Sequence, residues 1–212
     1  MSQPKSLQEA ERKVFRTVYQ DGLWDLFLGG IPLMMAVGPL LSVSLGDWWS
    51  SAVFLSFWGL VALALWLIRK HVIAPRVGVV KFGPARKRKL RRFNLVMLVV
   101  NVIALVLGIA FALRSTVPGQ WVAVVLGLSL LLGSSAAAYL LDFGRLYVYG
   151  LLACLSALVG EWLYTNHNVP HHGWPVTFGI TAGIMILTGG VIFVRLLRDN
   201  PLPEQPDLVQ DA

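Results

Sequence analysis

Six long apolar stretches, separated by short polar segments, dominate the chain. They cover approximately residues 26–45, 52–68, 93–113, 121–141, 146–163 and 176–197. A helix needs about 20 mostly apolar residues to cross a hydrocarbon core about 30 Å thick, and these stretches are close to that length. A buried helix of a soluble protein is usually shorter and keeps one polar face. The pattern therefore predicts an all-α integral membrane protein with six transmembrane helices.

The composition supports the same class. Of 212 residues, 56% are hydrophobic and only 14% are charged, whereas a soluble domain carries about 25% charged residues. The single cysteine, Cys154, excludes an intramolecular disulfide framework and a site with several thiolate ligands. The first 22 residues are polar and the first apolar stretch is long, so we expect no cleaved signal peptide.

Lysine and arginine predict the orientation of the six helices. Seventeen of the 18 lie before the first stretch, after the second, after the fourth or at the exit of the sixth, and the exception is Arg114. Because basic loops stay in the cytoplasm, we expect three in-out-in hairpins with both termini inside. Tryptophans at the opposite ends fit an outer aromatic belt: Trp48, Trp49, Trp121, Trp162 and Trp174. The small size and tight loops favour the cytoplasmic membrane of a bacterium.

The two terminal segments differ in pattern. Residues 1–22 predict an amphipathic interfacial helix, because Ser6 and Glu9 can form a capping box and apolar residues recur at helical spacing after them. Residues 199–212 hold three prolines and four acids without a helical period, so we expect a disordered acidic tail.

Residues 69–92 form a basic segment that we expect to be a structured cytoplasmic loop. Pro75 and Pro84 bracket a valine-rich stretch with two turn glycines, which predicts a compact loop or a short hairpin. Basic clusters beside a membrane span attract anionic lipids at about 1 kcal/mol per charge. Nucleic acid is not an expected partner. The candidate contacts for lipid headgroups or ion pairs in this segment are Arg76, Lys81, Arg86, Lys87, Arg88, Lys89, Arg91 and Arg92.

Two acidic residues lie four positions apart at the start of the first stretch. Asp21 and Asp25 share one face of a continuous helix. A carboxylate at the edge of a span is costly unless it is paired or hydrated. One interpretation is a structural ion pair of Asp25 with the basic loop, with Arg76 as the expected partner. The other is a contact with a substrate or a cation.

One group of residues resembles a metal site. Glu161, His167, His171 and His172 would all lie at the outer end, and zinc sites use His and Glu. However, Pro170 interrupts the group and no H-E-x-x-H pattern is present. We therefore expect neither a metal nor another cofactor, and the four residues remain weak candidates. A pH-sensitive outer loop is a further alternative.

Glycine, proline and small residues mark where the helices should bend or approach each other. Pro32 and Pro39, with neighbouring glycines, predict a kinked or irregular first helix. Three pairs have the small-xxx-small spacing that lets membrane helices pack closely: Gly179 with Gly183, Ser156 with Gly160, and Ser129 with Gly133.

The functional expectation follows mainly from what the spans contain. The centres of the six stretches carry no Asp, Glu, Lys or Arg, which disfavours ion-coupled transport. We expect a non-enzymatic bundle that assembles with itself or with a membrane partner and contacts anionic lipid through its basic loop. The alternative is a small transporter or permease subunit with a site at the irregular first span. A lipid-modifying enzyme that uses Asp21, Asp25 and the basic loop is a third interpretation.

Overall fold

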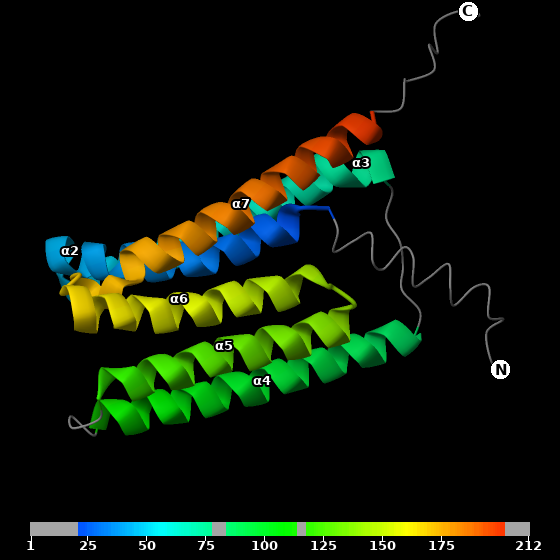
Figure 1. Ribbon diagram of the computed structural model, residues 1–212. Helices are drawn as coiled ribbons and strands as arrows, with labels where there is room; N and C mark the ends of the chain where they lie inside the picture. Colours follow the sequence, from blue (N-terminus) through cyan, green and yellow to red (C-terminus); the bar gives the residue numbers. More distant parts are fainter. Residues whose placement is uncertain (1–20, 78–83, 114–117, 202–212) are drawn as a thin grey trace, which may run out of the picture.

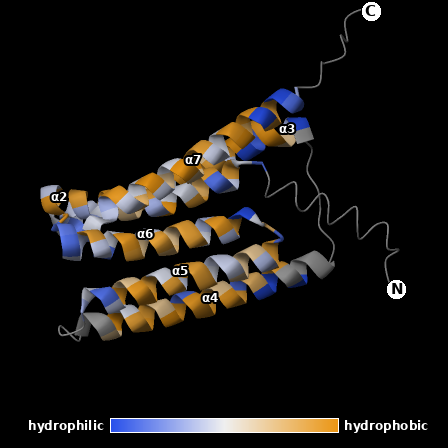
Figure 2. Cartoon of the chain, in the orientation of Figure 1, coloured by the Kyte–Doolittle hydropathy of each residue, from blue (hydrophilic) through white to orange (hydrophobic). Residues whose placement is uncertain are grey.

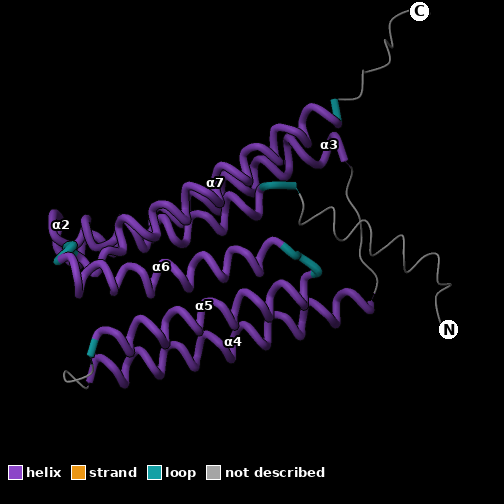
Figure 3. The backbone as a smooth tube through the Cα atoms, in the orientation of Figure 1, coloured by secondary structure: helices purple, strands orange, loops and turns teal. Residues whose placement is uncertain are grey.

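The computed structural model describes residues 21–77, 84–113 and 118–201, and within them the chain is helical and contains no strand (Figures 1 and 3). The interfacial helix expected over residues 1–22 and the tail expected over 199–212 fall almost entirely outside these ranges. The helices are α2 (Leu23–Ile68), η1, a π-helix (Arg69–Ile73), α3 (Ala74–Val77), α4 (Pro84–Leu113), α5 (Gly119–Leu141), α6 (Arg145–His167), η2 (His171–Gly173) and α7 (Trp174–Asp199).

The helix α2 contains the first two predicted spans. Gly46 interrupts it with φ 77° and ψ 164°, a conformation that glycine adopts without steric cost. The interruption separates a first arm, Leu23–Gly46, from a second arm, Trp48–Arg76. The arms pack together where glycines face aromatic rings, since a Cβ at Gly38 would lie 2.8 Å from the ring of Phe54. The two spans therefore form a hairpin with almost no loop.

The prediction of six long apolar helices is confirmed. In the part of the chain that the structure describes, six helices are long and apolar enough to cross a membrane, which is compatible with an integral membrane protein. In Figure 2 hydrophobic residues extend along the helices and polar residues gather near their ends. The six helices are Leu23–Gly46, Trp48–Arg76, Leu90–Ala110, Gly119–Leu141, Arg145–His167 and His171–Asp199.

The helices pack in a simple order that positions the candidate site. α7 packs against α2, α6 against α7, α5 against α6, and α4 against α5. Figure 1 accordingly shows α6 between the α2–α7 pair and the α4–α5 pair. The most apolar windows of the second arm of α2 and of α4 contain no buried residue, and many of their large apolar side chains are exposed.

Helices extend into both ends of the segment expected as a structured loop, residues 69–92. The second arm continues as a helix through η1 and α3 to Val77, and α4 already begins at Pro84. A proline at the first turn of a helix leaves no hydrogen bond unmade, which explains the start of α4. The π-helix ends at Ile73, and Pro75 lies two residues later. A proline and a π turn each change the local pattern of backbone hydrogen bonds without ending the helix. Residues 78–83 lie outside the described ranges.

A kinked or irregular first helix was expected at its prolines, and the backbone angles at both of them are helical. Pro32 and Pro39 both lie inside α2, and Gly46 is the residue of α2 with non-helical backbone angles. Membrane helices tolerate proline when neighbouring groups adapt to the missing hydrogen bond. The first arm is therefore continuous from Leu23 to Gly46.

The closest helix contacts are only partly at the predicted small residues. Gly160 is tightly packed, because a Cβ there would lie 2.7 Å from the carbonyl oxygen of His172. Gly183, in contrast, faces open space. On the same helix, a Cβ at Gly189 would lie 2.8 Å from the amide nitrogen of Leu26 and 2.9 Å from the carbonyl oxygen of Gly22. The tight contact between α2 and α7 is thus at Gly189.

Candidate functional site

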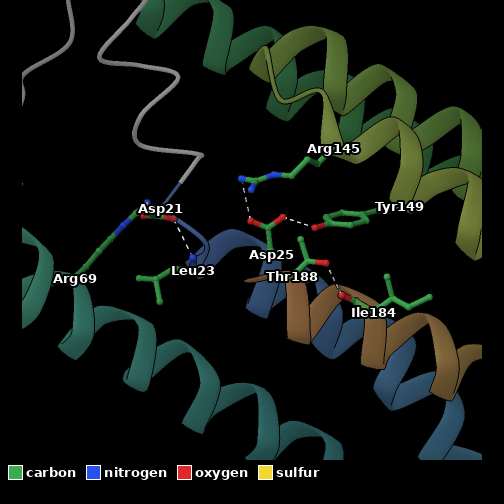
Figure 4. A network of polar contacts seen from close by, with 8 residues as sticks. All are labelled: Asp21, Leu23, Asp25, Arg69, Arg145, Tyr149, Ile184 and Thr188. Carbon is green, nitrogen blue, oxygen red and sulfur yellow. Dashed lines mark hydrogen bonds and ion pairs between the residues drawn. The ribbon is translucent and has the colours of Figure 1, made fainter. Parts of the chain in front are cut away.

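A polar network lies at the end of the bundle where α2 begins (Figure 4). Asp21 lies just before the first arm and Asp25 in its first turn, while Arg69 comes from the end part of the second arm. Arg145 and Tyr149 come from the first turns of α6. The network therefore joins residues that are more than 100 positions apart in the sequence.

Asp25 is the centre of this network. Its side chain is 0% exposed, its Oδ1 accepts a hydrogen bond of 2.5 Å from the hydroxyl of Tyr149, and its Oδ2 lies 3.1 Å from Nη2 of Arg145. The side chain of Arg145 is 28% exposed, so the pair lies between the interior and the surface. An isolated carboxylate at this depth would be very unfavourable. The ion pair and the tyrosine together make its burial possible.

The expected partner of Asp25 was Arg76, and the structure corrects this. Arg76 instead donates from Nη1 to the carbonyl oxygens of Leu197, at 3.1 Å, and Asn200, at 3.4 Å. These oxygens belong to the C-terminal end of α7, where carbonyl groups lack partners within the helix and attract a cation. Arg76 therefore holds α3 against the end of α7.

Asp21 has a separate role at the start of α2. Its Oδ1 accepts a hydrogen bond of 3.0 Å from the amide of Leu23, and its Oδ2 lies 3.7 Å from Nη2 of Arg69. Burial raises the pKa of the Asp21 carboxyl above its ordinary value, and Arg69 and the bonds from backbone amides only partly oppose this effect. The carboxylate of Asp25 adds a smaller rise.

In the basic run at the start of α4, the side chains that the structure describes are not among the contacts of this network. Arg88, Arg91 and Arg92 are exposed. Lys81 lies outside the described residues, and the same holds for the side chains of Arg86, Lys87 and Lys89.

A second buried carboxylate lies at the opposite end of the bundle. Oε2 of Glu161 is 2.8 Å from Nδ1 of His172, whose ring stacks on Tyr164 with centroids 4.3 Å apart. His167 instead lies against Trp162. Within the described residues no three His, Cys, Asp or Glu side chains gather as a metal site would require. The structure thus joins two of the four candidate residues.

His172 reaches Glu161 through an unusual backbone. His171, His172 and Gly173 have φ values of 55°, 54° and 62°, so three successive residues are in the left-handed region. This conformation costs about 1–2 kcal/mol for a residue with a Cβ. The turn lets Gly173 pack against Gly160, where a Cβ at position 173 would lie 2.7 Å from the Gly160 carbonyl oxygen.

Three members of the network were not predicted from the sequence: Arg145, Tyr149 and Thr188. Thr188 of α7 lies beside Tyr149 and donates to the carbonyl oxygen of Ile184 at 2.7 Å (Figure 4). The useful signal was the spacing of Arg145 and Tyr149, which share a helix face four positions apart as Asp21 and Asp25 do. No family model, no curated protein and no solved structure matches this chain.

Proposed function

We propose that this chain is a non-enzymatic integral membrane protein of six spans, with both termini in the cytoplasm, that binds anionic lipid at its cytoplasmic end. The helix surfaces that point away from the bundle assemble with a second copy or with another membrane protein. The setting we propose is the cytoplasmic membrane of a bacterium.

The observation that carries the proposal is the uneven distribution of charge along the bundle. Arg69, Arg76 and Arg145 lie at the end where α2 begins and α7 ends. The other end carries the exposed tryptophans Trp48, Trp121 and Trp162, and Trp66 is exposed near the basic end. Basic residues on one side and tryptophans at the interface are the pattern of a protein oriented by the positive-inside rule.

The non-enzymatic character is supported by the partners of the buried polar groups. Asp25 is held by Arg145 and Tyr149, and Glu161 by His172. The hydroxyl of Ser156 lies 2.7 Å from that of Thr181 and donates to a backbone carbonyl of its own helix. Groups that bond to one another across helices hold the helices in register, which favours a structural role.

The assembly is supported by the outward faces of two helices. Leu55, Leu60 and Leu63 of the second arm are more than half exposed, and the apolar part of α4 is exposed in the same way. Lipid can cover these faces, and so can apolar helices of a partner. The alternative remains a small transporter or permease subunit with a site at the first span, where Pro32 and Pro39 lie inside α2.

Cysteine labelling in intact cells tests the orientation. Cys154→Ala removes the native thiol, and Asn166→Cys and Arg88→Cys then place single thiols at exposed positions near opposite ends of the bundle. A membrane-impermeant maleimide should label position 166 in intact cells and position 88 only after permeabilisation. The reverse pattern, or labelling of both thiols in intact cells, would contradict the proposal.

A further inference from the structure

A pocket of about 260 Å³ lies between the two arms of α2, beside the polar network. Its walls are almost entirely apolar and aromatic, and its charged member is Arg69 at the rim. Specific pockets for drug-sized ligands measure about 300–1,000 Å³, so this one has room for part of a larger molecule. The lining residues are Leu23, Trp24, Phe27, Leu65, Trp66 and Arg69.

Two cationic side chains lie against tryptophan rings in the walls of the pocket. The guanidinium of Arg69 lies 5.5 Å from the ring centroid of Trp24, and the ammonium of Lys70 lies 4.9 Å from that of Trp66. A guanidinium has five N–H donors and binds a phosphate through two of them at once. Its side chain here is 44% exposed, so an anion can approach it. The pocket therefore combines an apolar interior with a cationic rim.

The local backbone holds this arrangement in place. The π-helix η1 begins at Arg69, so the rim cations lie at the step where the helix changes its hydrogen-bond pattern. Such π turns occur frequently at functional sites. On the other wall, Asp21 bonds the amide of Leu23 and Asp25 is fixed by Arg145 and Tyr149. Both walls are thus positioned before any ligand binds.

We propose that this pocket binds one anionic phospholipid, with its phosphate at Arg69 and Lys70 and the first part of an acyl chain against Trp24, Phe27 and Trp66. The proposal rests on the orientation proposed above. It assigns anionic lipid to one specific site, in place of a general attraction of lipid headgroups to the basic run on α4. An amphiphile matches both parts of the pocket, since its charge complements the rim and its chain covers the apolar walls. Tryptophan and arginine at one level are also typical of the headgroup region.

Native mass spectrometry of the full chain, titrated with phosphatidylglycerol, phosphatidylcholine or inorganic phosphate, tests the site. We expect a saturable adduct of one phosphatidylglycerol, with weaker binding of phosphatidylcholine and no competition by inorganic phosphate. The Arg69→Gln/Lys70→Gln variant should weaken the first adduct about thirtyfold. Arg88→Gln/Arg91→Gln, which removes the same charge from the exposed run on α4, should leave it nearly unchanged.

A further variant distinguishes a loss of lipid binding from a loss of folded protein. Arg69 contacts Asp21, so its replacement can disturb the start of α2, whereas Lys70→Gln alone removes the cation over Trp66. Lys70→Gln should keep the thermal stability of the parent and still weaken phosphatidylglycerol binding several-fold.

Equal losses in the Arg69/Lys70 and the Arg88/Arg91 variants would overturn the specific site, and so would unchanged binding in the former. Competition by inorganic phosphate would mean that the rim binds phosphate without the acyl chain, which also contradicts the proposal. Each of these results leaves the labelling pattern of positions 88 and 166 intact. A reversed labelling pattern, in contrast, overturns the orientation itself.

Discussion

Each end of the bundle pairs a deeply buried carboxylate with a basic side chain, but the two pairs are stabilised in different ways. At the first end, Asp25 is paired with Arg145, and both partners lie on regular α-helices. At the second end, Glu161 meets His172, which sits in a strained left-handed turn. Arginine is always protonated in proteins, whereas histidine is charged only in one of its two forms.

The two contacts therefore differ in the side chain and in the backbone that hold the carboxylate. The Asp25 pair joins α2 to α6 through a fixed charge and an additional tyrosine hydroxyl. The Glu161 pair joins α6 to the turn before α7, and backbone strain opposes it. We therefore expect the first end to be the more rigid anchor of the bundle, and the four tests that follow run from the largest expected effect to the smallest.

The largest effect should come from breaking the Asp25–Arg145 pair on one side. Arg145→Gln leaves a buried carboxylate without its cation, and we expect it to lower the free energy of unfolding by about 3–5 kcal/mol. Asp25→Asn should cost less, and the double variant should lose less than the sum because the two residues interact directly. Thermal unfolding in detergent measures each value.

Arg76→Gln is the matched control for this cycle. Arg76 contacts the end of α7 at Leu197 and Asn200. Its loss combined with Asp25→Asn should therefore be additive. Additive losses for Asp25 with Arg145 would show that the ion pair is absent in the protein.

The second test concerns the packing of α7 near the first end. Gly189→Ala forces a methyl group against backbone atoms of Leu26 and Gly22, which cannot move as a side chain could. We expect a loss of about 1–3 kcal/mol. Gly183→Ala on the same helix meets open space and should be neutral or slightly stabilising, because alanine favours a helix over glycine. Equal effects of the two changes would contradict the close contact.

The third test concerns the second end. His172→Gln removes the ring that meets Glu161 and stacks on Tyr164. A hydrogen bond to a charged group contributes about 1.5–3 kcal/mol, and release of the strained backbone offsets part of it. We therefore expect a loss of about 1–2 kcal/mol, below that of Arg145→Gln. His167→Gln, which changes an exposed residue at the same end, should have little effect. If His172→Gln were as damaging as Arg145→Gln, the two ends would be equivalent anchors.

The sequence predicts the helices better than the contacts between them. Hydropathy and length alone locate six apolar helices, because crossing a bilayer sets both quantities. The short turn at Gly46 changes neither the hydropathy nor the length of the two spans beside it. The first two spans were therefore predicted as separate helices joined by a loop. The helix through η1 and α3 was missed because Pro75 and the valines after it favour a loop or strand by local preference alone.

The candidate site depends on packing that the sequence does not encode locally. Asp25 was identified because a carboxylate at the edge of a span needs a partner. Ten basic residues of the predicted loop were available on the same side, and Arg145 was a single residue in a short turn. The choice between them depends on which helices lie beside α2, and that order follows from the three-dimensional fit at residues such as Gly189.

The smallest effect should be the pH dependence contributed by Asp21, which lies just before the first arm. Burial raises the pKa of its carboxyl above the ordinary value near 3.8, so the ionised form is the less favourable one in the folded protein. As the pH falls from neutral towards that ordinary value, the folded protein binds a proton before the unfolded chain does, and its stability rises relative to a variant that cannot titrate.

Asp21→Asn keeps a side-chain oxygen for the amide of Leu23 and should raise the unfolding temperature at neutral pH by about 2 °C or less. This advantage should shrink as the pH is lowered to about 4.5, whereas Asp199→Asn, at an exposed position, serves as the control. The opposite result would be a parent protein that is more stable than Asp21→Asn at neutral pH, with a difference in unfolding temperature that disappears on acidification. It would mean that the pairing with Arg69 outweighs the effect of burial on the Asp21 carboxylate.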